Sequence, residues 1–462
     1  MHRASGGIYM SDPLRAIRNG EELSLRQQII LIARLSFPAI LAQISSVIMQ
    51  YIDASMVGRL GPDASASIGL VSSTTWLVNG VVTAAGMGFS VRVAHKIGAK
   101  DDAGARNIVR WGTLCAFLFS LFLTALTAAY SIYLPSVMGG AQEIRRDATA
   151  YFLIYALTIP VQQLLLVSEG MIQSSGNIRL PSILNVAMCA LDVVFNFILI
   201  PRFGVAGAAL GTSLAKVVIT AVMLWHLFVK SEYLHLIDRE KSEKQSFTDF
   251  AAKEIPVSLK IAVPVAIDSM IMGFAYVAFT RVVSPFGTIA IAANSFAITA
   301  ESLCYMPGYG IGVAATTIVG QCIGARRQEL GKKLGWFATA LGMLVMGLSG
   351  ALMYVFAPAM IGVLSPDLQI RSLGTRILRI EAFAEPFYGA SIVAAGVFRG
   401  AGETMMSSVL NLLSVWVVRI PLAAFLGSKY GLVGAWIAMA SELCVRGILF
   451  LIRMAFWNAK KA

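Results

Sequence analysis

Three polar residues interrupt long apolar stretches of the sequence, where a charge is costly. Asp53 lies six residues before Arg59, near the end of one stretch, and Asp192 lies in another. Asn196 follows Asp192 by four residues, which places both side chains on one face of a helix, one turn apart. Because Asn196 lies six residues before Arg202, we expect it at about the depth of Asp53. Two carboxylates and an amide supply oxygen ligands that suit a hard cation or a shared proton.

Further polar residues in apolar stretches are candidates for a substrate pathway. An ionisable residue in such a stretch is a functional candidate by default, and the alternative is a hydrogen bond that fixes helix packing. The candidates are Gln50, Asp268, Glu301 and Glu385. Asp268 lies only eight residues after Lys260, and Glu385 directly precedes Pro386. We expect no metal site other than a Na⁺ site at Asp53, Asp192 and Asn196.

The elements that carry these residues are predicted to be membrane-spanning helices. The chain of 462 residues is 57% hydrophobic and 13% charged, and its mean hydropathy is +0.73. Soluble domains carry about 25% charged residues. A helix crosses the hydrocarbon core with about 20 apolar residues, whereas an isolated strand would leave its backbone unpaired there. We therefore predict an all-α polytopic membrane protein with twelve transmembrane helices, at 31–57, 66–91, 111–134, 149–170, 181–201, 205–229, 258–283, 289–318, 334–360, 376–398, 406–427 and 431–453.

The distribution of Lys and Arg predicts that both termini are cytoplasmic. An even number of spans puts the two ends of the chain on one side, and the loops on that side hold most of the positive charge. Cytoplasmic loops of membrane proteins carry such an excess. The resulting division, in a bacterial inner membrane, is a cytoplasmic N-terminal segment (1–30), an N-lobe (31–229), a cytoplasmic linker (230–257) and a C-lobe (258–462).

The two lobes repeat each other at one constant offset in residue number, which we call the repeat offset. The identical pairs that share it are Pro38 and Pro264, Gly61 and Gly287, Gly98 and Gly324, Gly176 and Gly402, and Asn185 and Asn411. Each lobe holds six predicted spans, so the two copies share one orientation. We therefore expect two six-helix bundles related by a pseudo-two-fold axis along the membrane normal, with the transport site at their interface.

Four more charged residues in the spans are expected to form internal ion pairs that fix helix packing. They are Lys216, Arg419, Glu442 and Arg446. Lys216 and Glu442 are separated by the repeat offset, which would make them equivalent positions with opposite charge. We therefore expect each of these two to pair within its own lobe.

Several segments resemble the multidrug and toxic compound extrusion (MATE) transporters. The stretch FPAILAQISSVIMQYIDASMVGRLG (37–61) is similar to the opening helix of that family. GMGFSVRVAHKIGA (86–99) and IGVAATTIVGQCIGAR (311–326) resemble its paired glycine-rich helices. AGVFRGAGET (395–404) and VVRIPLA followed by GLVGAW (417–436) resemble its tenth-to-eleventh-helix region. The resemblance covers nearly the whole chain.

The resemblance implies a cation-coupled antiporter that exports organic, often cationic and amphipathic, compounds in exchange for H⁺ or Na⁺. Relatives carry an acid at the position of Asp53, where it takes part in cation coupling, and many carry one at the position of Asp268. Relatives with a cation site in the N-lobe place Asn first and Asp one turn later, whereas Asp192 precedes Asn196 here. The wider superfamily contains lipid-linked oligosaccharide flippases.

Other functional classes fit the residues less well. A flippase for a lipid-linked oligosaccharide or cell-wall precursor is the alternative, but it should present cationic groups to a pyrophosphate, and the mid-membrane residues here are mainly acidic. An enzyme would need a nucleophile–base pair or a metal cluster, and the sequence offers neither, nor a nucleotide-binding loop. The net charge of +12 reflects cytoplasmic loops, so we expect no nucleic-acid partner. We expect a monomer without a cofactor, driven by an H⁺ or Na⁺ gradient.

Overall fold

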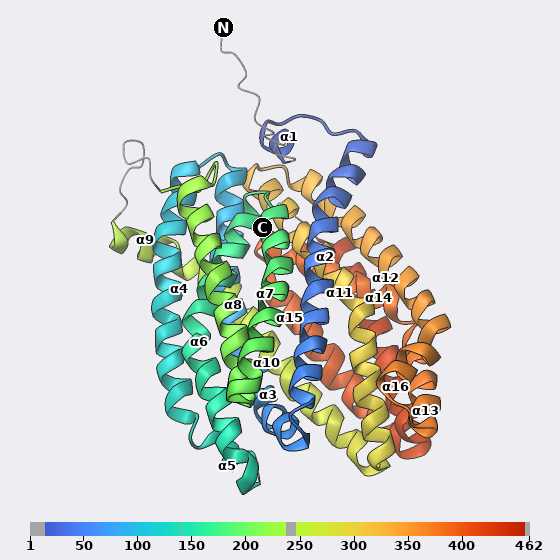
Figure 1. Cartoon of the computed structure of the whole chain (residues 1–462). Coiled ribbons are helices and arrows are strands. Elements are labelled where there is room, and N and C mark those ends of the chain that lie inside the picture. The colour runs from blue at the N-terminus through green and yellow to red at the C-terminus, as the bar shows by residue number, and fades with distance from the viewer. Residues whose placement is uncertain (1–13, 140, 237–245, 458–462) are drawn as a thin grey trace.

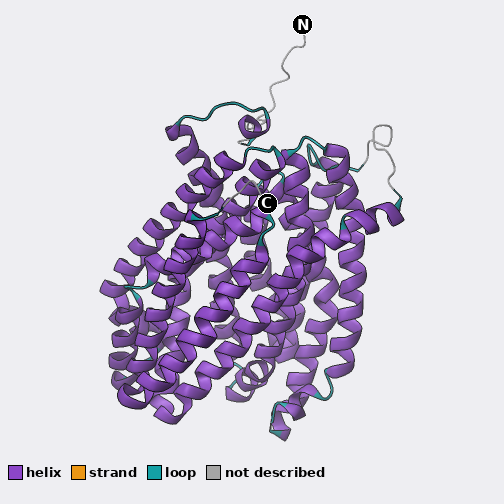
Figure 2. Ribbon diagram, turned by 180° about the vertical axis from the view of Figure 1, so that it is seen from behind, coloured by secondary structure: helices purple, strands orange, loops and turns teal. Residues whose placement is uncertain are grey.

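The computed structural model describes residues 14–139, 141–236 and 246–457, with the backbone alone at Pro62, and almost all of them lie in helices (Figure 2). Ten continuous helical runs in these ranges are long and apolar enough to cross a membrane. The first described helix and the end of the last one lie at the same end of the bundle, which we call the termini end (Figure 1). The fold is therefore that of an all-α polytopic membrane protein.

The first half of the chain supplies six long helices and two short ones. They are α1 (Arg15–Arg18), α2 (Leu25–Gly58), α3 (Pro62–Gly98), α4 (Asp102–Tyr130), α5 (Leu134–Val137), α6 (Gln142–Ser174), α7 (Arg179–Phe203) and α8 (Val205–Trp225), which runs into the π-helix η1 (His226–Lys230). A capping box begins α2: Ser24 Oγ accepts from the Gln27 amide, and Gln27 Oε1 accepts from the Ser24 amide at 2.8 Å. The helix therefore starts six residues before the predicted span.

The second half follows the same plan with two irregularities. Its elements are α9 (Phe247–Lys253), α10 (Ile255–Val283), the 3₁₀ turn η2 (Ser284–Phe286), α11 (Thr288–Gly324), α12 (Gln328–Leu364), α13 (Leu368–Glu381), α14 (Glu385–Ala401), α15 (Thr404–Leu413), the π-helix η3 (Ser414–Arg419) and α16 (Ile420–Ala455). The predicted linker at 230–257 lies partly outside the described residues, so the boundary between the lobes stays a prediction.

Twelve spans are recovered when these irregularities are taken into account. The predicted spans 406–427 and 431–453 form one helical run from Thr404 to Ala455, which Gly431 interrupts with φ 60° and ψ −144°. The predicted span 376–398 is broken between α13 and α14. Pro386 stands at the start of α14. It has no N–H to donate to the preceding turn, and its ring would clash with the carbonyl four residues earlier, so the helix cannot continue unbroken. The predicted twelve-helix, two-bundle layout is confirmed.

The internal repeat is visible in the backbone as paired residues with positive φ. Gly61 and Gly287 have φ of 118° and 92°, and Lys100 and Arg326 have 60° and 57°. Both pairs are separated by the repeat offset, as the sequence predicts. Because two non-glycine residues take this rare conformation at matching places, the two halves share the same chain path there.

In the last third of the two halves, matching residues are separated by one residue more than the repeat offset. Gly204 and Gly431 have φ of 58° and 60°, and their separation is one residue longer than the repeat offset. The extra residue lies in η3, since a π turn holds more residues than an α turn and the matching stretch 188–193 is ordinary α-helix. The counterpart of Glu442 is therefore Ala215, and the prediction that Lys216 and Glu442 are equivalent is wrong.

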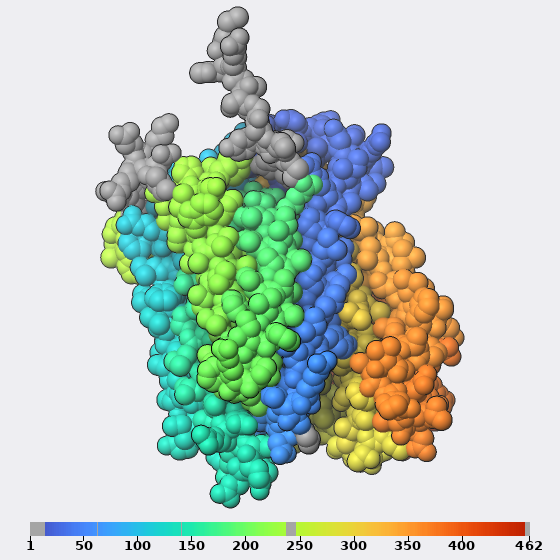
Figure 3. Space-filling view, viewed as in Figure 1, coloured from blue at the N-terminus to red at the C-terminus, as the bar shows by residue number. Residues whose placement is uncertain are grey.

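Helix α2 lies along the seam between the two halves. Figure 3 shows it in blue, with the green helices of the first half on one side and the yellow and orange helices of the second half on the other. It packs on both α7 and α11. Near the termini end, Ile32 and Leu35 of α2 share a buried apolar cluster with Ile311 and Ile318 of α11. Asp53, near the other end of α2, is thus carried by a helix that touches both bundles.

Candidate functional site

The structure brings Asp53, Asp192 and Asn196 together. Helix α2 packs against α7, and Asn196 Nδ2 donates a 2.8 Å hydrogen bond to Asp53 Oδ1 and a 3.2 Å hydrogen bond to Asp192 Oδ2. Asp192 and Asn196 are fully buried, and Asp53 is half-buried. Asn196 therefore lies level with Asp53, as the spacing from Arg59 and Arg202 predicts. We call these three residues the N-lobe cluster.

Two oxygens of the N-lobe cluster have no hydrogen-bond donor. They are Asp192 Oδ1 and Asn196 Oδ1, and both are buried. A buried acceptor without a partner costs about 1–3 kcal/mol. A proton or a small cation would satisfy it. The described residues hold no cluster of three or more His, Cys, Asp or Glu side chains arranged for a metal ion. Any Na⁺ here would therefore need the amide oxygen of Asn196 beside the carboxylates.

Helix α8 supplies two further residues at the N-lobe cluster. Gly211 lies directly against Asn196, and a Cβ at this position would overlap the Oδ1 atom and lie 3.0 Å from Cγ. Lys216 lies near enough to act electrostatically on both Asp192 and Asp53. Lys216 thus faces acids of its own half, as predicted, and its partners are the cluster itself. The sequence did not assign either residue to the site, because the packing of α8 on α7 is not visible in it.

The acids of the second half form two separate groups. Asp268 of α10 accepts hydrogen bonds of 3.0 and 3.1 Å from Asn411 Nδ2 of α15. Glu301 and Glu385 are buried in a different place, at the break between α13 and α14. Glu381 joins them there: it is fully buried, and it interacts electrostatically with both. Glu381 was not among the residues predicted from the sequence, although it precedes Glu385 by only four residues.

The carboxylates of Glu381 and Glu385 have no hydrogen-bond partner on any oxygen. They lie on either side of the helix break, where the chain leaves α13 at residue 381 and enters α14 at residue 385. The remaining pathway candidate, Gln50, is exposed on α2 one turn before Asp53. The structure therefore groups Glu301 with Glu385 and leaves Asp268 apart from them, and it records no hydrogen bond from Gln50 to the N-lobe cluster.

Glu442 forms the predicted internal ion pairs. Its Oε2 atom lies 2.6 Å from Arg419 Nη2 and accepts from Arg446 Nη2 at 2.8 Å. Its Oε1 atom accepts from Arg446 Nε at 2.8 Å and from Ser414 Oγ. Glu442 is fully buried and Arg446 nearly so. This network ties η3 to α16, so its role is to fix the packing of the second half.

A family model named MatE matches two parts of the chain, residues 38–198 and 264–425, which together make up more than half of it. The chain belongs to the MatE family. The two matched parts begin at the repeated prolines, Pro38 and Pro264, so the family model recurs at the repeat offset. The resemblance of the sequence to MATE transporters is confirmed, and with it a multi-pass membrane transporter.

Similar proteins match this MatE chain over nearly its whole length. A probable multidrug resistance protein NorM from Thermotoga maritima is 27% identical over 431 residues, which cover 91% of this chain and 90% of that protein. The crystal structure of a MATE in complex with MaL6 has a TM-score of 0.87 at 21% identity and covers 98% and 100% of the two chains. A transporter of the MOP superfamily from Pyrococcus furiosus, described as having a binding pocket of reverse polarity, has a TM-score of 0.87 at 22% identity and covers 98% and 99%.

The halves of this MatE chain meet at the termini end through a reciprocal pair of hydrogen bonds. His95 of α3 donates from Nε2 to the Gly400 carbonyl of α14 at 2.7 Å. Gln321 of α11 donates from Nε2 to the Ser174 carbonyl of α6 at 2.8 Å. His95 and Gln321 are separated by the repeat offset, and so are Ser174 and Gly400, which makes the two bonds equivalent by the repeat. We call this contact the seam latch.

Two glycines allow α3 and α11 to cross closely at the seam latch. A Cβ on Gly98 would overlap the Gln321 carbonyl, and a Cβ on Gly324 would overlap the His95 carbonyl. Each glycine thus lies against the backbone of the other half. The sequence identified Gly98 and Gly324 as a repeated pair but did not indicate that they face each other's helices.

Proposed function

We propose that this protein is a secondary active antiporter that exports organic cations in exchange for H⁺ or Na⁺ by alternating access. The N-lobe cluster is the observation that carries this proposal. Two acids from separate helices share one amide donor, and two buried oxygens stay without a partner. Like charges held close together disfavour double ionisation, and an arriving proton or cation relieves that repulsion.

The charges around the N-lobe cluster suit a site that an ion enters and leaves. If all groups are ionised, Asp53 and Asp192 outnumber Lys216 by one negative charge. A single H⁺ or Na⁺ would neutralise that excess. Lys216 would then balance the remaining negative charge. An ion shifts a conformational equilibrium only through its different affinity for the two states, and a cluster split between α2 and α7 offers that difference if the two helices separate.

The substrate class is inferred from acids and aromatic rings in the second half. The rings of Tyr305 and Tyr388 lie 5.7 Å apart, and the ring of Tyr309 lies 6.0 Å from that of Tyr305. They adjoin Glu301 and Glu385, which act electrostatically on Tyr305. Aromatic faces and buried carboxylates both attract organic cations. The relative from Thermotoga maritima carries the name of a multidrug resistance protein, which supports several substrates rather than one.

The termini end is proposed to face the cytoplasm of a bacterial cell, with the protein as a monomer in the inner membrane. The last turn of α3 carries Lys96 at this end and the loops carry Lys100, Arg326 and Arg327, in keeping with the excess of positive charge on the cytoplasmic side. The seam latch would then close the cytoplasmic side. Opening that side to take up substrate would break both latch hydrogen bonds, and closing it again would restore them.

Pro38 lies inside α2, the helix that also carries Asp53. A proline removes one backbone hydrogen bond and lets the helix bend. A change of charge at Asp53 could therefore be linked to bending of α2, and a static kink is the alternative. Solved MATE structures include one in a straight and one in a bent conformation.

The test is efflux of a fluorescent organic cation from proteoliposomes with a pH gradient or a Na⁺ gradient imposed separately. The wild type should export the dye under one of the two gradients and not without a gradient. Asp53→Asn should abolish this efflux while the protein is still produced and inserted. Asp63→Asn is the matched control, because Asp63 is an exposed acid in the first turn of α3.

The outcomes separate the parts of the proposal. Undiminished efflux by Asp53→Asn would reject the role of the N-lobe cluster. Equal loss in Asp63→Asn would show that the change acts through surface charge. Failure of the wild type to move any cation under either gradient, together with gradient-independent movement of a lipid-linked sugar, would replace the antiporter with the flippase.

A further inference from the structure

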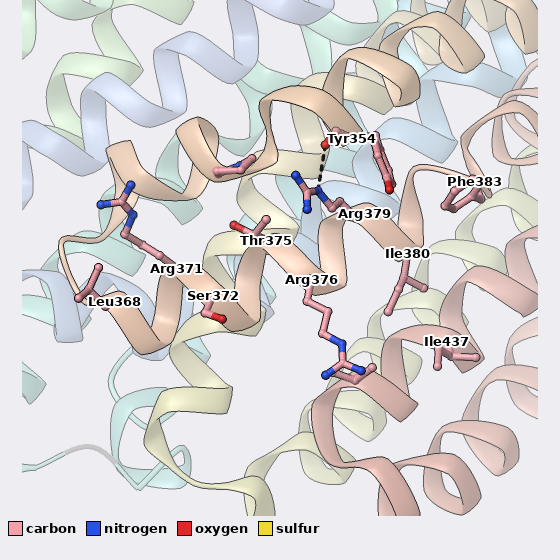
Figure 4. Close-up of a pocket in the computed structure, with 12 residues that line it drawn as sticks. Tyr354, Leu368, Arg371, Ser372, Thr375, Arg376, Arg379, Ile380, Phe383 and Ile437 are labelled. Atoms are coloured by element: carbon pink, nitrogen blue, oxygen red, sulfur yellow. Dashed lines mark hydrogen bonds between the residues drawn. The ribbon is translucent and has the colours of Figure 1, made fainter.

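A cavity of about 830 Å³ lies in the second half, between α12, α13 and α16. None of the predicted pathway residues lines it, and it is not the interface between the halves. Figure 4 shows its wall formed largely by one side of α13, with Arg371, Ser372, Thr375, Arg376 and Arg379 along the groove. It is therefore a site on the outside of the second bundle.

The cavity has a strongly basic wall. Arg371, Arg376 and Arg379 all line it, and no Asp or Glu is among its lining residues. Arg379 Nε donates to the Tyr354 carbonyl at 3.2 Å, and its guanidinium lies 5.2 Å from the centre of that tyrosine ring. No ion pair joins Arg371 or Arg376 to an acid within the described residues. The groove thus presents positive charge without a protein counter-ion.

This charge lies on a membrane helix and points away from the bundle. The opposite side of α13 is buried, and it includes Ile377 and Glu381. Helix α13 starts at the end of the molecule away from the termini, and Arg371 and Arg376 lie about 5 and 12 Å along its axis from Leu368. For a bilayer that covers the bundle, we take this range to run from the headgroup level toward the hydrocarbon. An arginine on the lipid side costs several kcal/mol unless an anion accompanies it.

Apolar side chains flank the arginines. Leu368 is 77% exposed and Phe383 is 72% exposed, and both line the same cavity. Arginine binds phosphate through two parallel hydrogen bonds, and the hydroxyls of Ser372 and Thr375 add further donors. A ligand that fits must therefore join an anionic phosphate to an apolar body. A phospholipid of the adjoining leaflet has this chemistry.

We propose that this cavity is a binding site for an anionic phospholipid. Arg371 and Arg376 hold the phosphate, Ser372 and Thr375 donate to it, and an acyl chain runs along Phe383. The bound lipid supplies the counter-ion that the protein lacks at this place. The proposal does not depend on which substrate or ion the protein transports.

The test uses phosphatidylglycerol as the probe and the purified full chain in detergent. Binding is measured by native mass spectrometry across a titration of the lipid. Arg371→Gln with Arg376→Gln should bind about thirtyfold more weakly, equivalent to about 1 kcal/mol of lost hydrogen bonding to phosphate for each arginine. Arg146→Gln with Arg202→Gln is the control, because it removes two exposed arginines from the first half and should bind like the wild type.

Two further arms identify the ligand. Phosphatidylethanolamine should bind more weakly than phosphatidylglycerol to the wild type, and inorganic phosphate should not compete. Equal binding by both double variants, or full competition by inorganic phosphate, would overturn the proposal. If the cavity variant fails to fold, photocrosslinking of the wild type with a photoreactive phosphatidylglycerol decides the matter. Labels should map to α12, α13 or α16, and labels spread evenly over the chain would refute the site.

Discussion

The close crossing at the seam latch gives the sharpest prediction. Gly98→Ala and Gly324→Ala each add one methyl group where α3 and α11 meet. The new Cβ on either residue would lie 2.9 Å from the Cα of the facing helix, Gln321 in one case and His95 in the other. Because the obstacle is backbone, no rotamer change can relieve it. Carbon atoms prefer about 3.5–4.0 Å, so the helices must move apart by about 0.6 Å or more at this point.

The cost follows from this overlap. Overpacking a close contact costs about 1–3 kcal/mol, and the seam latch would weaken as the helices separate. Each substitution should therefore shift the equilibrium away from the closed termini end by about 5- to 150-fold. The two substitutions act on the same crossing, so their effects should not add fully. Gly69→Ala is the control, since it lies on α3 and its Cβ would meet nothing within 4 Å.

The assay is a distance measurement by double electron–electron resonance. Spin labels at Arg110 of α4 and Lys333 of α12 report on the two halves near the termini end, and both positions are exposed. The native cysteines are first replaced. The Gly98→Ala protein should show a longer or broader distance distribution than Gly69→Ala in the same lipid. Identical distributions for the two variants would refute the reasoning that this crossing holds the end closed.

Three other predictions rest on single contacts. Gly211→Ala should displace Asn196 and reduce ion-driven efflux at least tenfold in the liposome assay, whereas the control Gly69→Ala should stay active. Equal efflux by the two variants would show that α8 does not contribute to the site. Glu442→Gln breaks a buried ion-pair network and should lower the free energy of unfolding by about 3–5 kcal/mol. The measurement is the thermal midpoint in detergent, which should fall for Glu442→Gln and not for the same substitution at an exposed acid. Ser24→Ala removes the capping box of α2 and should cost about 1 kcal/mol, read as faster amide hydrogen exchange in the first turn of α2 only.

Much of the fold could be predicted from the sequence because the bilayer limits the choices. Apolar runs of about 20 residues that cross a bilayer must be helices. The number of these runs and the internal repeat then predict two bundles of six helices. The N-lobe cluster was also within reach. Asp192 and Asn196 share a helix face, and the distances of Asp53 and Asn196 from Arg59 and Arg202 set their common depth.

The parts that were missed depend on contacts between helices. Lys216 and Gly211 join the cluster only through the packing of α8 on α7. The acceptors of the seam latch are the backbone carbonyls of Ser174 and Gly400. Because every residue has a backbone carbonyl, the sequence cannot indicate that these two accept a hydrogen bond. The basic cavity was missed because Arg371 precedes the predicted span 376–398 and because the groove depends on how α13 packs against α12 and α16.

The extra residue in η3 has a consequence for the history of the two halves. If they descend from one duplicated gene, a single codon was later gained in one copy or lost from the other, and the helix absorbed the mismatch as a wider turn instead of a break. Because the wider turn takes in the extra residue, side chains beyond it keep the direction of their counterparts, which now lie one residue beyond the repeat offset. The shift in numbering also means that Lys216 and Glu442 arose at different positions of the repeat, a lysine beside two acids on α8 and a glutamate between two arginines on α16.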